Sequence, residues 1–149
     1  KDVPGLYWTA YAWAGWTNLD KNNPEALAVL PKAARFMERV LELDGDYQFA
    51  GTDAFFGVYY AGRPKIAGGD PERGRKHFET AITHSPDFLT NRLLFAKYYA
   101  VNVLDEELFR EILGEIGSAD LGALPEARLA NVVAQIKSKK LLEQIDDLF

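Results

Sequence analysis

Cysteine is absent from this 149-residue sequence, and methionine and histidine are scarce, with one and two residues respectively. Without cysteine the chain can form no disulfide, thiolate nucleophile or thiolate metal site. The two histidines, His77 and His84, leave too few ligands for a metal site built around them. We therefore expect neither a bound metal nor a cofactor.

Excess positive charge and long apolar runs are also missing. The net charge is -5 at neutral pH and the basic residues are dispersed, so nucleic acid is not an expected partner. No apolar run approaches the roughly 18 residues that a membrane-spanning helix needs. Because the chain starts at Lys1 rather than methionine, we expect a truncated or processed N-terminus, with any signal peptide or lipid anchor preceding it.

Catalytic groupings do not stand out either. There is no clear Ser/His/Asp, Cys/His or paired-carboxylate arrangement, and Gly68 and Gly69 lack the strand and the lysine of a phosphate-binding loop. We therefore expect that the protein is not an enzyme. Its 48% hydrophobic and 26% charged residues are typical of a globular protein, which we expect to form one domain over residues 1–149.

What the sequence does contain is a repeated helical pattern. Two segments place small and apolar residues at helical spacing and end on proline or glycine, as in the second helix of a tetratricopeptide hairpin. Small residues let a partner helix approach closely, and apolar residues fill the seam. The two sets are Gly74, Phe78, Ala81 and Pro86, and, earlier in the chain, Ala33, Met37, Val40 and Gly45.

The first helices of such hairpins show a pattern of their own, an aromatic, a small and a second aromatic residue. It occurs as Phe56, Gly57 and Tyr60, and again as Phe95, Ala96 and Tyr99. Paired helices of this kind bury their apolar faces by stacking on neighbouring pairs. We therefore predict an all-α fold of about three tetratricopeptide-like helix pairs with a long C-terminal capping helix.

Proline, glycine and capping residues set the expected helix boundaries. The helices are predicted over residues 4–19, 26–43, 47–60, 71–85, 86–103, 105–116 and 125–149. Pro31 is expected to kink the second of these or to begin a separate helix. The last one is predicted to cap the array with a polar outer side, and its apolar residues recur at helical spacing as Leu129, Val132, Val133, Ile136, Leu141, Ile145 and Leu148.

The loop over residues 62–70 is the main irregularity of the pattern. Tyr60 and Gly74 lie fourteen positions apart, five more than the roughly nine of an uninterrupted repeat. Insertions in repeat proteins form surface loops and often lie on a binding face. Arg63 and Lys65 could therefore meet carboxylates on a partner or an organic acid, although an ordinary solvated loop would carry the same charges.

A groove is the second candidate site, because first helices line the concave surface of a tetratricopeptide array. Repeat positions not used for packing project into it as Gly51, Ala54, Val58, Ala61, Thr90, Leu93, Lys97 and Ala100. This predicts a mostly apolar groove with Lys97 as its one charge, suited to an apolar ligand or an inserted partner segment. Trp16, Tyr59 and Tyr98 lie beside packing positions and are further candidates, with additional core packing as the alternative.

One common role of such repeats, the clamping of a terminal carboxylate, is not expected. A carboxylate clamp needs lysine, arginine or asparagine in the groove. Phe55 and Leu94 occupy positions where those polar residues would lie. A more general protein-binding scaffold remains open.

Longer stretches of the chain share a family pattern. They are LYWTAYAWAGWTNL at residues 6–19, YYAGRP and GGDPERGRKHFE within 59–79, FAKYYAV at 95–101, and RLANVVAQ and LLEQIDDLF within 128–149. With these stretches the chain resembles the T-component family of TRAP transporters, periplasmic tetratricopeptide-repeat proteins associated with tripartite solute uptake. The resemblance extends over nearly the whole sequence.

The resemblance implies a function that composition and spacing alone do not give. It implies a non-enzymatic periplasmic scaffold, lipid-anchored through residues upstream of this chain or free, that binds the extracytoplasmic solute-binding protein of a TRAP transporter. It also implies a homo-oligomer, while the groove and the loop suggest a small hydrophobic or organic-acid ligand. The alternative is a generic tetratricopeptide interaction module of the cell envelope.

Overall fold

The computed structural model describes residues 2–149, which form helices and turns and no strand. This confirms the predicted all-α fold. The α-helices are α1 (Val3–Leu19), α2 (Pro24–Leu43), α3 (Tyr47–Ala61), α4 (Pro71–His84), α5 (Leu89–Leu94), α6 (Glu106–Ser118), α7 (Arg128–Glu143) and α8 (Ile145–Leu148). A π-helical turn over Phe95–Ala100 continues α5, and two 3₁₀ turns lie at Lys65–Ala67 and Pro125–Ala127.

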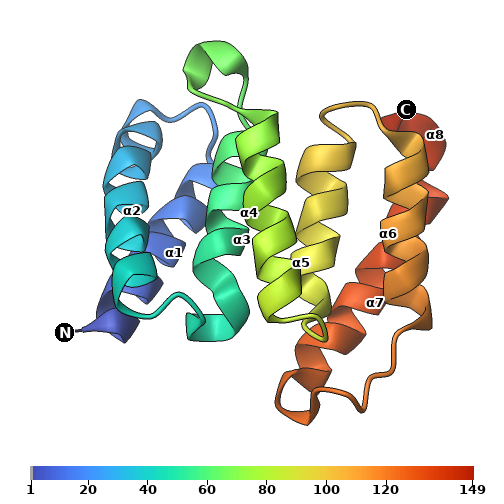
Figure 1. The fold of residues 1–149 in the computed structure, drawn as a ribbon. Coiled ribbons are helices and arrows are strands. Elements are labelled where there is room, and N and C mark those ends of the chain that lie inside the picture. Colours follow the sequence, from blue (N-terminus) through green and yellow to red (C-terminus); the bar gives the residue numbers. More distant parts are fainter. Residues whose placement is uncertain (1) are drawn as a thin grey trace.

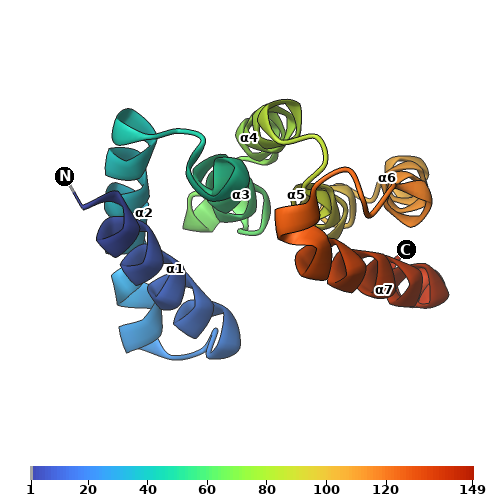
Figure 2. The same ribbon diagram turned by 90° about the horizontal axis from the view of Figure 1, so that it is seen from below.

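The helices follow one another through the molecule as packed pairs (Figure 1). Helix α1 packs on α2 and α3 packs on α4, while α5 with its π-helical continuation packs against α6 and α7. Seen along the helices, α1 and α3 lie on one side of the array and α2 and α4 on the other (Figure 2). Successive pairs therefore present a continuous surface built from first helices.

Side-chain caps explain where half of the eight α-helices in residues 2–149 begin. Four of them start after an aspartate or asparagine whose side chain accepts a backbone N–H of the first turn, a bond that a helix start otherwise lacks. Three also carry proline in the first turn, where no N–H is needed. The capping residues are Asp2 for α1, Asn23 for α2, Asp70 for α4 and Asp105 for α6.

The prediction that Pro31 could begin a separate helix is wrong, because α2 runs unbroken from Pro24 to Leu43. Proline deprives the carbonyl four residues earlier of its hydrogen-bond donor. Pro31 and Leu27, the residue that loses this donor, both lie on the exposed side of α2. Water can therefore take the place of the missing N–H.

The predicted repeat positions lie at the helix seams. Ala33, Met37, Val40, Phe78 and Ala81 are fully buried. A Cβ at Gly74 would lie 2.7 Å from the Ala61 nitrogen and 2.9 Å from the Gly57 oxygen, so only glycine permits this approach of α3 and α4. The packing role expected for the small residues is confirmed.

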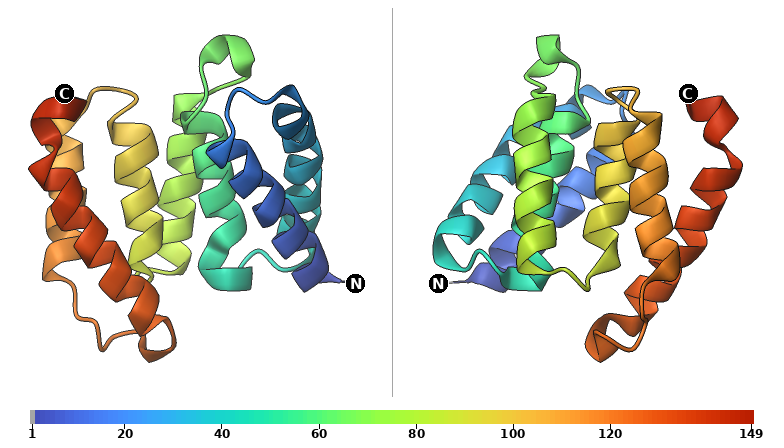
Figure 3. Two further views of the ribbon diagram at one scale, coloured as in Figure 1. Left: turned by 180° about the vertical axis from the view of Figure 1, so that it is seen from behind. Right: turned by 45° about the vertical axis from the view of Figure 1, so that its right-hand side comes forward.

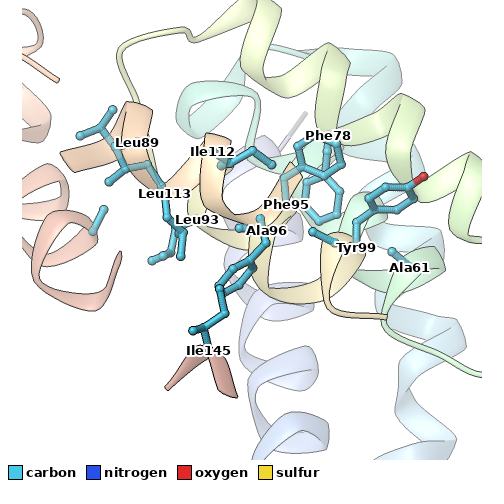
Figure 4. Packing of buried hydrophobic residues seen from close by; sticks show 14 residues of the cluster. Ala61, Phe78, Leu89, Leu93, Phe95, Ala96, Tyr99, Ile112, Leu113 and Ile145 are labelled. Atoms are coloured by element: carbon cyan, nitrogen blue, oxygen red, sulfur yellow. The ribbon is translucent and has the colours of Figure 1, made fainter. Parts of the chain in front are cut away.

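The largest hydrophobic cluster extends from α3 to the C-terminal end of the array (Figure 4). Its members come from α3 to α8 and surround Phe78 and Phe95, whose ring centroids lie 5.3 Å apart. A second cluster around Tyr7 and Met37 joins α1, α2 and α3. Helix α3 contributes to both clusters, so it connects the N-terminal pair to the rest of the core.

Helix α3 opens with an unusual left-handed turn. Gln48, Phe49 and Ala50 have φ angles of 53°, 59° and 56°, and the right-handed helix begins only after them. Left-handed residues other than glycine cost about 1–2 kcal/mol each. The ring of Phe49 stacks on Phe88 with centroids 4.5 Å apart, and its carbonyl accepts a hydrogen bond from Asn91, so tertiary contacts hold the turn.

The apolar residues predicted along the final helix do not share a buried face. Leu129, Val133 and Ile136 are 78%, 39% and 54% exposed, respectively. The buried side of α7 instead carries Asn131, Ala134 and Ser138. The helix also ends at Glu143, and the short α8 returns Ile145 to the core.

Unpaired backbone groups explain why α7 buries polar residues. The start of α5 presents an N–H group and the end of α6 presents C=O groups without helical partners, and Gln135 of α7 donates to the Ile116 and Ala119 carbonyls at 3.0 and 3.1 Å. Asn131 accepts the Leu89 N–H at 3.0 Å and donates to the Asp87 carbonyl at 2.8 Å, and Ser138 donates to the Leu113 carbonyl at 3.0 Å. Satisfying these groups fixes the rotation of α7 and turns Leu129, Val133 and Ile136 outward, while Leu141 packs against the core.

Candidate functional site

A groove of about 320 Å³ lies between α1, α3 and α5. Its walls carry six aromatic residues, Tyr7, Trp8, Tyr11, Phe55, Phe88 and Tyr98. Small or aliphatic residues from the same helices, among them Gly15, Gly51 and Leu94, complete the apolar surface. The groove is thus built mainly from first helices, as the repeat pattern predicts.

None of the sixteen residues that line the groove is charged. Its polar groups are neutral and belong to Asn18, Gln48, Thr90, Asn91 and the tyrosines. The hydroxyl of Tyr7 lies against Gly51, where any Cβ would overlap it. Burial raises the pKa of Tyr7 well above its usual value, so this hydroxyl stays protonated.

Asn91 is a buried polar residue in the groove wall. Its Nδ2 donates to the Phe49 carbonyl at 3.0 Å and to the Ala81 carbonyl at 3.3 Å. Its Oδ1 has no hydrogen-bond partner. The amide therefore joins α3, α4 and α5 at one end of the groove.

Of the predicted site residues, the structure brings Ala54, Val58 and Tyr98 together in the groove wall. Trp16 is 38% exposed but is not part of the lining. Lys97 also lies outside the lining, with its Nζ 5.4 Å from the Tyr98 ring centroid.

Only some of the residues that the repeat pattern places in the groove line it. Gly51 and Thr90 line the groove, as projected. Ala61, Leu93 and Ala100 are buried in the main hydrophobic cluster instead. Leu94 and Tyr98 line the groove instead, each one position after the projected Leu93 and Lys97, so the projection is out of register beyond Thr90 in the third pair.

Tyr59 and Arg63 form a separate contact at the base of the loop. The Arg63 guanidinium lies 3.6 Å from the centroid of the Tyr59 ring, and Arg63 Nε donates to the Tyr59 carbonyl at 2.7 Å. Arg63 therefore holds the loop to α3. Lys65 is exposed in the 3₁₀ turn of the same loop.

Two features of the surface escaped the sequence reasoning. Trp8 and Tyr11 of α1 line the groove, although only the unusual spread of aromatics around this helix could have suggested it. Ile66, at the tip of the loop, is 99% exposed. A single isoleucine among loop residues gives no periodic signal, so nothing in the sequence distinguished it.

Both histidines pair with aspartates that are distant in the sequence. His77 Nδ1 lies 2.7 Å from Asp53 Oδ1, and His84 Nδ1 lies 2.7 Å from Asp46 Oδ1, so both pairs join α4 to the α3 region. The hydrogen bond to Asp46 and the charge of its carboxylate raise the pKa of His84 above its usual value. Within residues 2–149 no group of three or more His, Asp or Glu side chains is placed to hold a metal ion.

None of the helices in residues 2–149 combines the length and the apolar character needed to cross a bilayer.

Comparison with known proteins gives a match over the whole chain. The family model described as TRAP transporter T-component matches residues 1–149. None of the curated proteins searched matches the chain.

Proposed function

The chain belongs to the TRAP transporter T-component family, and we propose that it acts as a periplasmic scaffold that binds the extracytoplasmic solute receptor of its transporter. Family membership carries the association with TRAP transport. The uncharged groove supports a binding role, because it offers a concave, largely apolar surface on rigid helices. No catalytic role is part of the proposal.

We also propose that the groove takes a neutral apolar ligand or an apolar segment of the receptor. A carboxylate buried in a groove without a cation would lose its hydration and gain no partner. The lining holds aromatic rings and neutral hydrogen-bonding groups, with no lysine or arginine. Of the two ligand classes that the sequence suggested, the hydrophobic one therefore fits this groove better than an organic acid.

Calorimetric titration of the chain with its cognate solute receptor tests the receptor role. We expect saturable binding, with the receptor both empty and loaded with solute. If two folded proteins show no heat and no co-migration at high micromolar concentration, the receptor role is wrong. A generic envelope interaction module, the alternative function, would then be the better description.

Three further parts of the proposal rest on the family alone. They are periplasmic location, a lipid anchor in residues preceding this chain and self-association into a homo-oligomer. Sedimentation of the purified chain would test self-association, and fractionation of cells carrying the complete gene product would test location and anchoring.

A further inference from the structure

The loop between α3 and α4 projects beyond the ends of the helices (Figure 1 and Figure 3). Its tip is the 3₁₀ turn Lys65–Ala67, with Ile66 at its centre. Ile66 is 99% exposed, the most exposed large apolar residue among those described. Exposed apolar residues are common, so its significance depends on whether the loop is free to bury it.

Arg63 links the two arms of the loop and holds them to α3. Its guanidinium lies over the Tyr59 ring, and its Nε donates to the Tyr59 carbonyl at 2.7 Å. Its Nη2 donates across the loop to the Gly68 carbonyl at 3.3 Å. One side chain therefore ties both arms of the loop to α3.

Backbone hydrogen bonds hold the tip itself. The N–H groups of Ala67 and Gly69 both donate to the Pro64 carbonyl, at 2.9 and 3.0 Å. Gly68 has a φ of 82°, which favours glycine, and a Cβ at Gly69 would overlap the Arg63 carbonyl. Asp70 then donates its N–H to the Tyr60 carbonyl at 2.9 Å and caps α4.

We infer that Ile66 is an apolar anchor that inserts into an apolar socket on the solute receptor, an inference that rests on the proposed receptor role. A loop already fixed in its bound shape loses little conformational entropy on binding, which favours its use as a rigid knob. Lys65 makes no ion pair with the described residues, and it lies beside Ile66. The socket should therefore carry a carboxylate at its rim.

A protein socket fits these observations better than a lipid surface. Stable attachment to a membrane needs a larger apolar area or several basic residues, and this tip offers one isoleucine and one lysine. The net charge of -5 also opposes binding to anionic lipid. A few side chains that fill pockets carry most of the binding energy of a protein interface, so a single fixed isoleucine can contribute substantially to one.

Receptor titrations of Ile66→Ala and Ile66→Asp test the inference. We expect Ile66→Ala to weaken binding about tenfold or more and Ile66→Asp to weaken it further. Position 66 is fully solvated in the free protein, so neither substitution is expected to unfold it. Leu129→Ala, a comparable deletion at an exposed leucine on α7, is the matched control and should leave affinity within about twofold.

Arg63→Lys tests whether the fixed loop shape matters. It keeps the charge and Ile66 but loses the planar group that bonds Tyr59 and Gly68. We expect weaker receptor binding together with faster amide exchange at Ala67 and Gly69. Unchanged binding alongside faster exchange would overturn the role of the rigid loop.

The possible outcomes separate the inference from the proposed function. If the unaltered chain binds the receptor and both Ile66 variants bind equally well, the anchor is wrong and the receptor role stands. If the unaltered chain does not bind, both fail together. Ile66-dependent flotation with phosphatidylethanolamine–phosphatidylglycerol vesicles, with unchanged receptor binding, would overturn the protein socket in favour of lipid.

Discussion

At the scale of single residues, the most informative contacts are those between positions far apart in the chain. His84 and Asp46 lie 38 positions apart, and Asn131 reaches Leu89 across 42 positions. Local spacing on one helix cannot reveal such partners, because helical patterns relate only residues three and four positions apart. The histidines therefore carried no signal in the sequence, although each one joins α4 to the α3 region.

The His84–Asp46 pair predicts a pH effect that can be measured directly. NMR titration should give His84 a pKa above its usual value of about 6.5, and Asp46→Asn should return it toward that value. Because the pKa of the folded state is raised, the pair stabilises the fold below about pH 6.5, and this contribution disappears as pH rises through the raised value.

Unfolding of the unaltered chain and of Asp46→Asn in urea, at pH 5.5 and at pH 9, gives the matching stability measurement. The difference in free energy of unfolding between the two proteins should be present at pH 5.5 and absent at pH 9. A difference that is the same at both pH values would mean that Asp46 acts without His84.

At the scale of helices, the sequence predicted elements better than their rotation. All seven predicted helices begin within three residues of an observed α-helix or its 3₁₀ lead-in, because proline and capping aspartates mark these positions strongly. The orientation of α7 could not be predicted from its apolar spacing. It depends on the unpaired ends of α5 and α6, which come to lie beside α7 only in the assembled structure.

Two glycine substitutions should have opposite effects on stability, because Gly74 lies at the close contact between α3 and α4 and Gly114 lies at an open position. Gly74→Ala should lower the free energy of unfolding by about 1–3 kcal/mol, because its Cβ would meet the backbone of α3. Gly114→Ala in α6, where a Cβ has no neighbour within 4 Å, should raise it by about 0.5–1 kcal/mol. Urea unfolding measures both, and a Gly74→Ala protein as stable as the parent would disprove the contact.

At the scale of the whole molecule, the curved arrangement of first helices produces the groove. Its apolar character agrees with the repeat pattern, and four of the positions projected from that pattern line it, namely Gly51, Ala54, Val58 and Thr90. The contribution of α1 was not predicted, since Trp8 and Tyr11 belong to no repeat. How α1 packs on α2 and α3 depends on tertiary contacts that one sequence does not specify.

Filling the groove should block the binding of apolar ligands. Gly15 lies in the groove wall with no neighbour within 4 Å of a Cβ, so Gly15→Trp can occupy the space without strain. We expect this change to weaken the binding of a neutral, fluorescent naphthylamine dye at least about tenfold. Gly114→Trp on α6 is the matched control, and equal dye binding by both variants would exclude the groove as the site.

The left-handed turn at the start of α3 has a consequence for folding. Arrays of helix pairs usually unfold unit by unit, because each unit touches only its neighbours. Here one amide, Asn91, bonds Phe49 and Ala81, and so joins three helices from two successive pairs. The turn cannot hold its conformation until α5 is in place, so we expect the centre of the array to melt as one cooperative block whose loss would remove the groove and release the loop together.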